Sequence, residues 1–165
     1  MEIEIERKFL VKGDFKPYAE RVRSIKQGYV AANNNGLAVR VRIYDGREAI
    51  LELKKGDYND KITQREYAYD IPVNEAVELL AMGPADSAPV EKERYYVPAG
   101  KHTWEVDVFH GANEGLVVAE IELLHADEDF ERPEWLGKEV TSELRYKNVM
   151  LAEIPYYMWK DLEEA

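Results

Sequence analysis

The chain contains many short stretches in which apolar and polar residues alternate. Such period-two alternation is typical of β-strands whose two faces meet different surroundings. Eight stretches show it, near 2–11, 25–31, 37–44, 48–55, 62–71, 90–97, 102–109 and 116–125. Because these predicted strands follow one another directly, hairpins and an antiparallel sheet are favoured over alternating strand–helix units.

Turn-forming residues separate several of these strands. Asp45-Gly46 stands between two alternating runs, which is a strong hairpin signal. Similar turn residues occur at 33–36, 56–57 and 98–100. The turns therefore support a series of consecutive antiparallel strands.

Four segments have a helical pattern: 17–24, 74–82, 142–153 and the last ten residues. Asn74 is a suitable N-cap for the second, and Gly83-Pro84 ends it. The last segment is predicted to be an amphipathic C-terminal helix. Its aromatic residues suit either a cover over the sheet or a contact in a homodimer.

The length of 165 residues predicts one domain over 1–165, large enough to fold without a disulfide or metal staple. The absence of cysteine excludes disulfides, thiolate metal sites and cysteine catalysis. No apolar run approaches the roughly 20 residues that a membrane span needs. The first eight residues are charged at every second position, unlike a signal peptide. We therefore expect a cytoplasmic protein with no membrane partner.

The charge balance is acidic, with 22 Lys and Arg against 33 Asp and Glu and a net charge of −11. This balance argues against a basic surface for nucleic acid, so we predict no nucleic-acid partner. An acidic protein can nevertheless contain a locally basic cavity.

The polar faces of the predicted strands are mostly ionic. The residues that alternate with the apolar ones are Glu2, Glu4, Glu6 and Lys8, then Arg40 and Arg42, Glu52 and Lys54, Gln64, Glu66, Ala68 and Asp70, Lys92, Arg94 and Tyr96, Glu105 and Asp107, and Glu120 and Glu122. Acidic residues dominate the first, seventh and eighth strands, and cations are concentrated on the third, fourth and sixth. The charges are therefore sorted by strand.

Two interpretations of these ionic faces compete. In the first, each face is simply in contact with water, which is usual for charged side chains. In the second, the eight strands close into an antiparallel barrel, which removes exposed edges, and the ionic faces line its interior. Buried charges are costly unless they are paired or bind a metal or a polyanion. The second interpretation therefore requires a ligand that needs both signs of charge.

A complex of triphosphate with a divalent metal is such a ligand. Guanidinium and ammonium groups match phosphate oxygens. Carboxylates repel phosphate, but they can hold Mg²⁺ or Mn²⁺, hard ions that bridge protein and phosphate oxygens. The sorted acidic and basic strands suit a site of this kind.

The N-terminal MEIEIERKFLV contains Glu4-Ile5-Glu6-Arg7-Lys8, an ExExK pattern. Further motifs follow it in order: QGY (27–29), VRVR (39–42), LELKKG (51–56), REYAYDIP (65–72), EKERYYV (91–97), WEVDVFHG (104–111), GLVVAEIEL (115–123) and WLGKEVT…RYKN (135–148). This ordered series resembles the CYTH superfamily, the triphosphate tunnel metalloenzymes, which have an N-terminal ExExK signature, and it is most similar to the short bacterial members.

The resemblance implies a mainly β (α+β) fold: a closed eight-stranded antiparallel barrel around a hydrophilic tunnel, with a few flanking helices and a C-terminal helix. It also implies a divalent metal, Mg²⁺ or Mn²⁺, and a small-molecule triphosphate substrate. The short bacterial members are chiefly associated with hydrolysis of inorganic tripolyphosphate to pyrophosphate and phosphate. Two alternatives are an adenylyl cyclase or general nucleoside triphosphatase, and a polyphosphate- or nucleotide-binding module without turnover.

The resemblance suggests roles for the ionic residues. Glu4, Glu6, Glu120 and Glu122 would hold the metal, with Glu66, Glu105 and Asp107 as helpers. Lys8, Arg40, Arg42, Lys54, Lys92 and Arg94 would bind the phosphates. Water activation by a metal-bound acid and by a lysine with a lowered pKa are both open, which makes Lys8, Lys54 and Lys92 catalytic candidates. Tyr29 would position Lys92 or the water, or serve as a packing aromatic.

Three positions depart from the family pattern. Gln64 stands where Arg is usual, Ala68 where a second acid is common, and Glu52 where Thr is usual. Arg65 follows Gln64 directly, but a shift of one residue turns a side chain to the other face of a strand. If this strand is regular, Gln64 and Glu66 face the tunnel and Arg65 faces outward.

Overall fold

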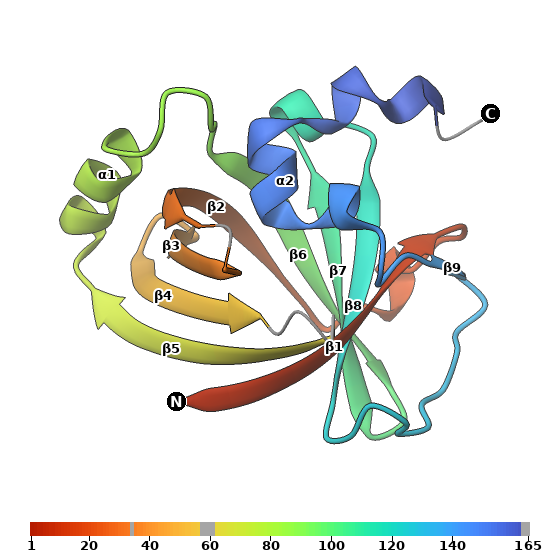
Figure 1. The fold of residues 1–165 in the computed structure, drawn as a ribbon. Helices are drawn as coiled ribbons and strands as arrows, with labels where there is room; N and C mark the ends of the chain where they lie inside the picture. Colours follow the sequence, from red (N-terminus) through yellow and green to blue (C-terminus); the bar gives the residue numbers. More distant parts are fainter. Residues whose placement is uncertain (34, 57–61, 163–165) are drawn as a thin grey trace.

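Eight antiparallel strands of the computed structural model close into a barrel (Figure 1). The structure describes residues 1–33, 35–56 and 62–162. The strands are β1 (Glu2–Val11), β2 (Arg21–Ala32), β3 (Leu37–Tyr44), β4 (Glu48–Gly56), β5 (Thr63–Ile71), β6 (Val90–Ala99), β7 (His102–Phe109) and β8 (Val117–Leu123). They are ordered β5-β4-β3-β2-β6-β7-β8-β1, and β1 pairs back with β5. The predicted barrel is therefore confirmed.

The ring is closed by β1, which pairs with two strands at different points of its length. Glu2–Ile5 pair with residues 63–66 of β5. Ile5–Leu10 pair with residues 118–123 of β8. As a result, the acidic residues of β1 lie between those of β5 and β8.

A ninth strand, β9 (Leu136–Glu139), extends the sheet by pairing with β1 outside the closed ring. The alternation pattern did not predict it. The strand has only four residues, and Gly137 and Lys138 interrupt its apolar positions. Short strands of this kind owe their position to the partner strand rather than to a pattern of their own.

The helix α1 (Val73–Ala81) corresponds to the prediction over 74–82. Its N-cap is Pro72 rather than Asn74, because the first helical turn already begins at Val73. The predicted helix over 17–24 is wrong: a 3₁₀ turn covers only Lys16–Tyr18, and β2 begins at Arg21. Pairing of residues 21–27 with β6 prevails over the local helical signal there.

The predicted helix over 142–153 is divided into a 3₁₀ turn at Leu144–Tyr146 and the short helix α2 (Asn148–Glu153), with Lys147 extended between them. In place of a continuous helix over the last ten residues, the described part of that segment has 3₁₀ turns at Tyr156–Met158 and Lys160–Leu162. A further 3₁₀ turn lies at Gly111–Asn113. No helix of the described residues is long and apolar enough to cross a membrane.

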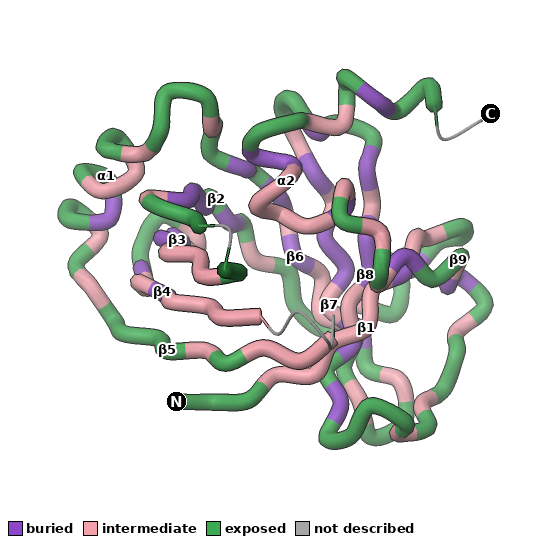
Figure 2. The backbone as a smooth tube through the Cα atoms, viewed as in Figure 1, coloured by how far each residue is buried: buried purple, intermediate pink, exposed green. Residues whose placement is uncertain are grey.

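The apolar faces of the strands point outward and are covered by helices and loops. Ala76 of α1 is fully buried against Val41 and Ile43 of β3. Trp159 of the C-terminal segment packs edge-to-face on Tyr146, with ring centroids 5.2 Å apart, and joins a cluster that includes Val118 of β8. Val118 shares the inner face of its strand with Glu120 and Glu122, so the C-terminal aromatics cover one end of the barrel interior rather than its outer face. Buried positions (purple in Figure 2) occur on β2, β3, β6, β7 and β8, whereas β1, β4 and β5 are mostly intermediate or exposed.

Candidate functional site

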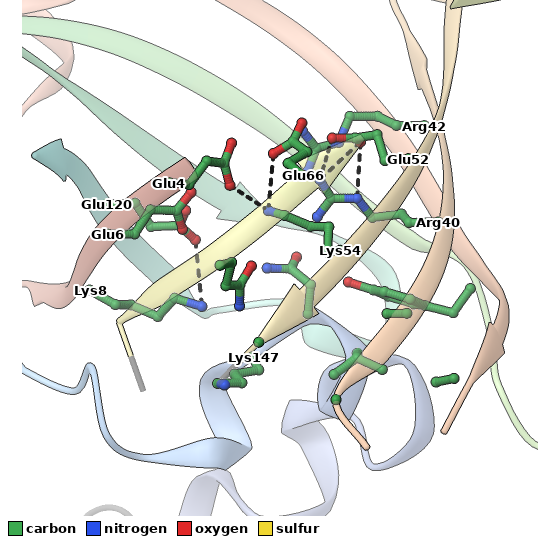
Figure 3. A pocket seen from close by; sticks show the side chains of 18 of the residues that line it. Glu4, Glu6, Lys8, Arg40, Arg42, Glu52, Lys54, Glu66, Glu120 and Lys147 are labelled. Atoms are coloured by element: carbon green, nitrogen blue, oxygen red, sulfur yellow. Dashed lines mark hydrogen bonds and ion pairs between the residues drawn. The ribbon is translucent and has the colours of Figure 1, made fainter. Parts of the chain in front are cut away.

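The barrel encloses an ionic cavity of about 410 Å³ (Figure 3). Most of the residues on the predicted ionic faces line it, and so does the candidate Tyr29: Glu4, Glu6, Lys8, Arg40, Arg42, Glu52, Lys54, Gln64, Glu66, Arg94, Glu105, Glu120 and Glu122. The interpretation of these faces as the interior of a barrel is thus confirmed. Their charges are buried because the outer faces of the same strands carry the apolar core.

Carboxylates crowd together where β1 meets β8. Glu6 is the register partner of Glu122, and Lys8 is the partner of Glu120. Burial, reinforced by the charge of Glu120, raises the pKa of Glu6 to about 8. Burial alone would raise the pKa of Glu120 as well, but Lys8, whose Nζ lies 3.5 Å from its Oε1, and Arg94 outweigh burial and lower it. This wall therefore concentrates negative charge that the protein itself neutralises only in part.

Lys54 lies between the carboxylates of two strands. Its Nζ is 3.0 Å from Glu4 Oε2 and 3.7 Å from Glu66 Oε2. Burial raises the pKa of Glu66 to about 9, and hydrogen bonds with Glu4 and Glu52 add to this shift. The raised pKa favours the protonated form of Glu66, whose single O–H group can donate a hydrogen bond to one acidic neighbour.

The opposite wall carries the arginines of β3. The guanidinium of Arg40 donates to both oxygens of Glu52 at 2.9–3.1 Å, and both side chains are buried. Burial would lower the pKa of Arg40, but the charge of Glu52 outweighs burial and raises it. Arg42 instead donates to Gln27 Oε1 at 2.8 Å and to Tyr44 Oη at 3.0 Å. The two arginines therefore have different electrostatic partners.

Two of the sequence-predicted residues, Lys92 and Asp107, are absent from the cavity wall among the described residues. Lys92 Nζ lies 2.6 Å from Asp107 Oδ2 and donates to Asn148 Oδ1 at 3.0 Å. The other contacts of Asp107 are with Arg94 Nε and Nη2, at 2.8 and 2.9 Å. Burial lowers the pKa of Lys92 to about 7. Lys92 and Asp107 therefore lie behind the cavity lining and contact it through Arg94 and Asn148, and their predicted roles stay predictions.

Several residues that line the cavity were missed by the sequence analysis. Tyr44 shares the face of Arg40 and Arg42 and extends their row toward the end of β3. Thr141, Lys147 and Asn148 come from the segment after β9, and Figure 3 shows Lys147 on this segment. The RYKN motif at 145–148 was the available signal for the last two, although its position in space depends on how the C-terminal segment folds back.

Strand β5 is regular in the region where this chain departs from the family pattern. Gln64 and Glu66 line the cavity, whereas Arg65 is exposed on the outer face. The expectation for a regular strand is therefore confirmed. Ala68 is the register partner of Glu52 on β4, so these two departures are direct neighbours across the sheet.

The comparison with known protein families agrees with the barrel fold and its ionic cavity. A family model described as the CYTH domain matches residues 2–154. The chain belongs to the CYTH family. This match spans all eight strands of the ring, β9 and the segment that contains Lys147 and Asn148.

Relatives of this CYTH domain have been named for an activity. It is 42% identical over 159 residues to an inorganic triphosphatase of Acetivibrio thermocellus, covering 96% of this chain and 98% of that protein. It is 36% identical over 154 residues to an inorganic triphosphatase of Nitrosomonas europaea, covering 90% and 96%. A solved structure of an inorganic triphosphatase has a TM-score of 0.65 at 33% identity, covering 91% of this chain and 97% of that one.

The cavity offers the type of ligand that a hard divalent cation requires. Glu4 Oε2 is buried and lacks a hydrogen-bond partner, because its approach to Lys54 does not have hydrogen-bond geometry. Glu6 and Glu122 are adjacent carboxylates on the same wall. No three His, Asp or Glu side chains of the described residues already form a metal-binding group. The donors therefore fit a hard ion such as Mg²⁺, which is usually held by one or two carboxylates with substrate phosphates and water.

Proposed function

We propose that this CYTH domain hydrolyses inorganic tripolyphosphate to pyrophosphate and phosphate, with Mg²⁺ or Mn²⁺ as the metal. The observation that carries the proposal is one cavity with a carboxylate wall on β1 and β8 facing arginines of β3, with Lys54 between them (Figure 3). The names of the relatives in Acetivibrio thermocellus and Nitrosomonas europaea support it.

The proposed mechanism relies on positioning and charge neutralisation. Phosphoryl transfer to water needs both, and it needs no nucleophile from the protein. Arg42, Lys54 and Lys8 would bind the phosphate oxygens. The carboxylates that would hold the metal are Glu4, Glu6, Glu120 and Glu122. When bound, the metal supplies charge stabilisation to the reacting phosphate and its leaving group.

The small number of aromatic residues in the cavity supports an inorganic substrate. Tyr29 and Tyr44 are the only aromatic residues among the described residues that line it. Tyr29 is buried, and the guanidinium carbon of Arg23 lies 4.4 Å from the centroid of the Tyr44 ring. The cavity therefore offers little free aromatic surface for stacking a nucleobase. This observation favours tripolyphosphate over nucleoside triphosphates.

The decisive experiment measures phosphate release from tripolyphosphate, ATP and pyrophosphate by the purified chain, with Mg²⁺, with Mn²⁺ and with EDTA. We expect rapid release from tripolyphosphate, slower release from ATP, and none in EDTA. Cyclic AMP and pyrophosphate formed from ATP would identify a cyclase instead. Calorimetric binding of tripolyphosphate without any turnover would identify a binding module.

The outward orientation of Arg65 leads to a prediction for β5. We expect Arg65→Ala to change kcat and KM for tripolyphosphate by less than about twofold, because surface substitutions away from a site have small effects. Gln64→Arg should lower the KM, because it adds a cation to the cavity wall. Steady-state phosphate release checks both variants. Collapse of activity in Arg65→Ala, with an unchanged circular dichroism spectrum, would contradict the assignment.

A further inference from the structure

Three arginines lie on the cavity wall, and each is 6% exposed. Two of them are held in bidentate fashion by a buried carboxylate: Arg40 by Glu52, and Arg94 by Asp107. The third, Arg42, has no carboxylate oxygen of the described residues within ion-pair distance. Arg42 therefore differs from the other two in having a neutral hydrogen-bond partner, although its charge acts at longer range on Glu52 and helps to lower the pKa of that carboxyl.

Gln27 provides the neutral partner of Arg42. It lies on β2, is fully buried and is the register partner of Arg42. Its Oε1 accepts the hydrogen bond from Arg42 Nε, while its own Nε2 has no hydrogen-bond partner among the described residues. Turning the amide over would direct its NH₂ group at the N–H of Arg42, so the donor and acceptor chemistry determines its orientation. The protein accepts an unpaired buried donor at this position.

The difference between a carboxylate and an amide partner matters for a polyanion. A phosphate that approaches Arg40 must compete with Glu52 for the same guanidinium. A phosphate that approaches Arg42 meets an oriented guanidinium. The hydrogen bonds described for Arg42 use its Nε and Nη1, and none of them uses Nη2. Because the guanidinium fork is held at Nε and Nη1, little side-chain freedom is lost when phosphate binds.

We propose that Gln27 is a positioning residue for triphosphate recognition: it orients Arg42 and leaves the charge of Arg42 available to the substrate. This proposal rests on the proposed function, because it concerns the same cavity. In the competing interpretation Gln27 only fills space in the barrel wall. That interpretation predicts changes in stability without a change in substrate affinity.

The test replaces Gln27 with residues of similar size. Gln27→Glu keeps the hydrogen bond but gives Arg42 the carboxylate partner that Arg40 already has. We expect its KM for tripolyphosphate to rise about tenfold or more, the scale of one charge-assisted hydrogen bond, with kcat changed much less. Gln27→Met leaves the charge of Arg42 in place but removes the acceptor, so we expect a smaller rise of about threefold. Asn74→Asp, which adds the same charge on the exposed surface of α1, should leave both constants unchanged.

A binding measurement separates this proposal from the proposed function. The rise in melting temperature on adding tripolyphosphate in EDTA reports affinity without turnover. It should be smaller for Gln27→Glu than for the wild type. If the wild-type chain binds tripolyphosphate but does not hydrolyse it when Mg²⁺ or Mn²⁺ is supplied, the proposed function is refuted, while the binding comparison in EDTA still decides the role of Gln27. Wild-type affinity in a folded Gln27→Glu variant would overturn the proposal. If Gln27→Glu does not fold, wild-type affinity in Gln27→Met would overturn it instead.

Discussion

Replacing Glu6 with Gln should reduce turnover about a hundredfold or more, yet it should raise the melting temperature in metal-free buffer. The loss of activity follows from removing one carboxylate from the wall proposed to hold the metal. The gain in stability follows because burial, and then repulsion by Glu120, disfavour the charged form of Glu6, as its raised pKa indicates. An amide of the same shape carries no charge and removes both penalties.

The stability gain should depend on pH in a defined window. The pKa of Glu6 is raised from 4.5 to about 8 in the folded protein, so its neutral form stabilises the fold fully below pH 4.5. This contribution is lost as the pH rises toward 8. The difference in stability between Glu6→Gln and the wild type should therefore grow from pH 4.5 to about 8. Each kcal/mol of this difference in the free energy of unfolding should raise the melting temperature of the variant over that of the wild type by about 2–4 °C.

Metal should reverse the order of stability, because it binds the wild type more tightly than the variant. Thermal melts with EDTA and with Mg²⁺, together with phosphate release, measure both effects. Glu2→Gln is the matched control, since Glu2 is an exposed acid on the same strand that is absent from the cavity lining. Full activity of Glu6→Gln at low metal concentration would rule out Glu6 as a ligand.

The strand pattern was sufficient to group the ionic side chains on one face of each strand, and the family resemblance predicted that this face lines the barrel interior. Parity along a strand determines which face a residue occupies, so Arg40, Arg42 and Glu52 were predicted to share a lumen with Glu6 and were found there. Parity also predicted that Arg65 points outward. These features follow from the geometry of a single strand and need no knowledge of its partners.

The parity of a residue along its strand does not determine how far its side chain lies behind the cavity wall. Lys92 and Asp107 share the face of Arg94 and Glu105, but they bind each other behind the cavity wall, where Asn148 of α2 contacts Lys92. The position of Asn148 depends on a segment that follows β6 by some fifty residues of chain and folds back by long-range packing. The closure of the barrel between β1 and β5 also depends on long-range contacts, because its register is set by pairing between strands that are distant in the sequence.

Replacing Arg42 with Lys should lower kcat/KM for tripolyphosphate by about tenfold to a hundredfold, although the charge is conserved. The guanidinium of Arg42 contacts Gln27 and Tyr44 through different nitrogen atoms. A lysine ammonium is a single point that cannot make both contacts and still present a planar pair of N–H groups to a phosphate. We expect most of the loss in KM, because the proposed contact already forms in the bound substrate.

The control for Arg42→Lys is Arg7→Lys on β1. Arg7 donates to both carboxylate oxygens of Glu139 on the outside of the barrel, so the same substitution there tests the loss of a planar fork away from the cavity. It should leave kcat and KM unchanged and cost about 1 kcal/mol of stability or less, because Arg7 is only partly buried. Steady-state kinetics and thermal melts of the two variants distinguish phosphate binding from general loss of packing. If Arg42→Lys had wild-type kinetics, a conserved charge would be enough at this position, and the bidentate grip of Arg42 on phosphate would be refuted.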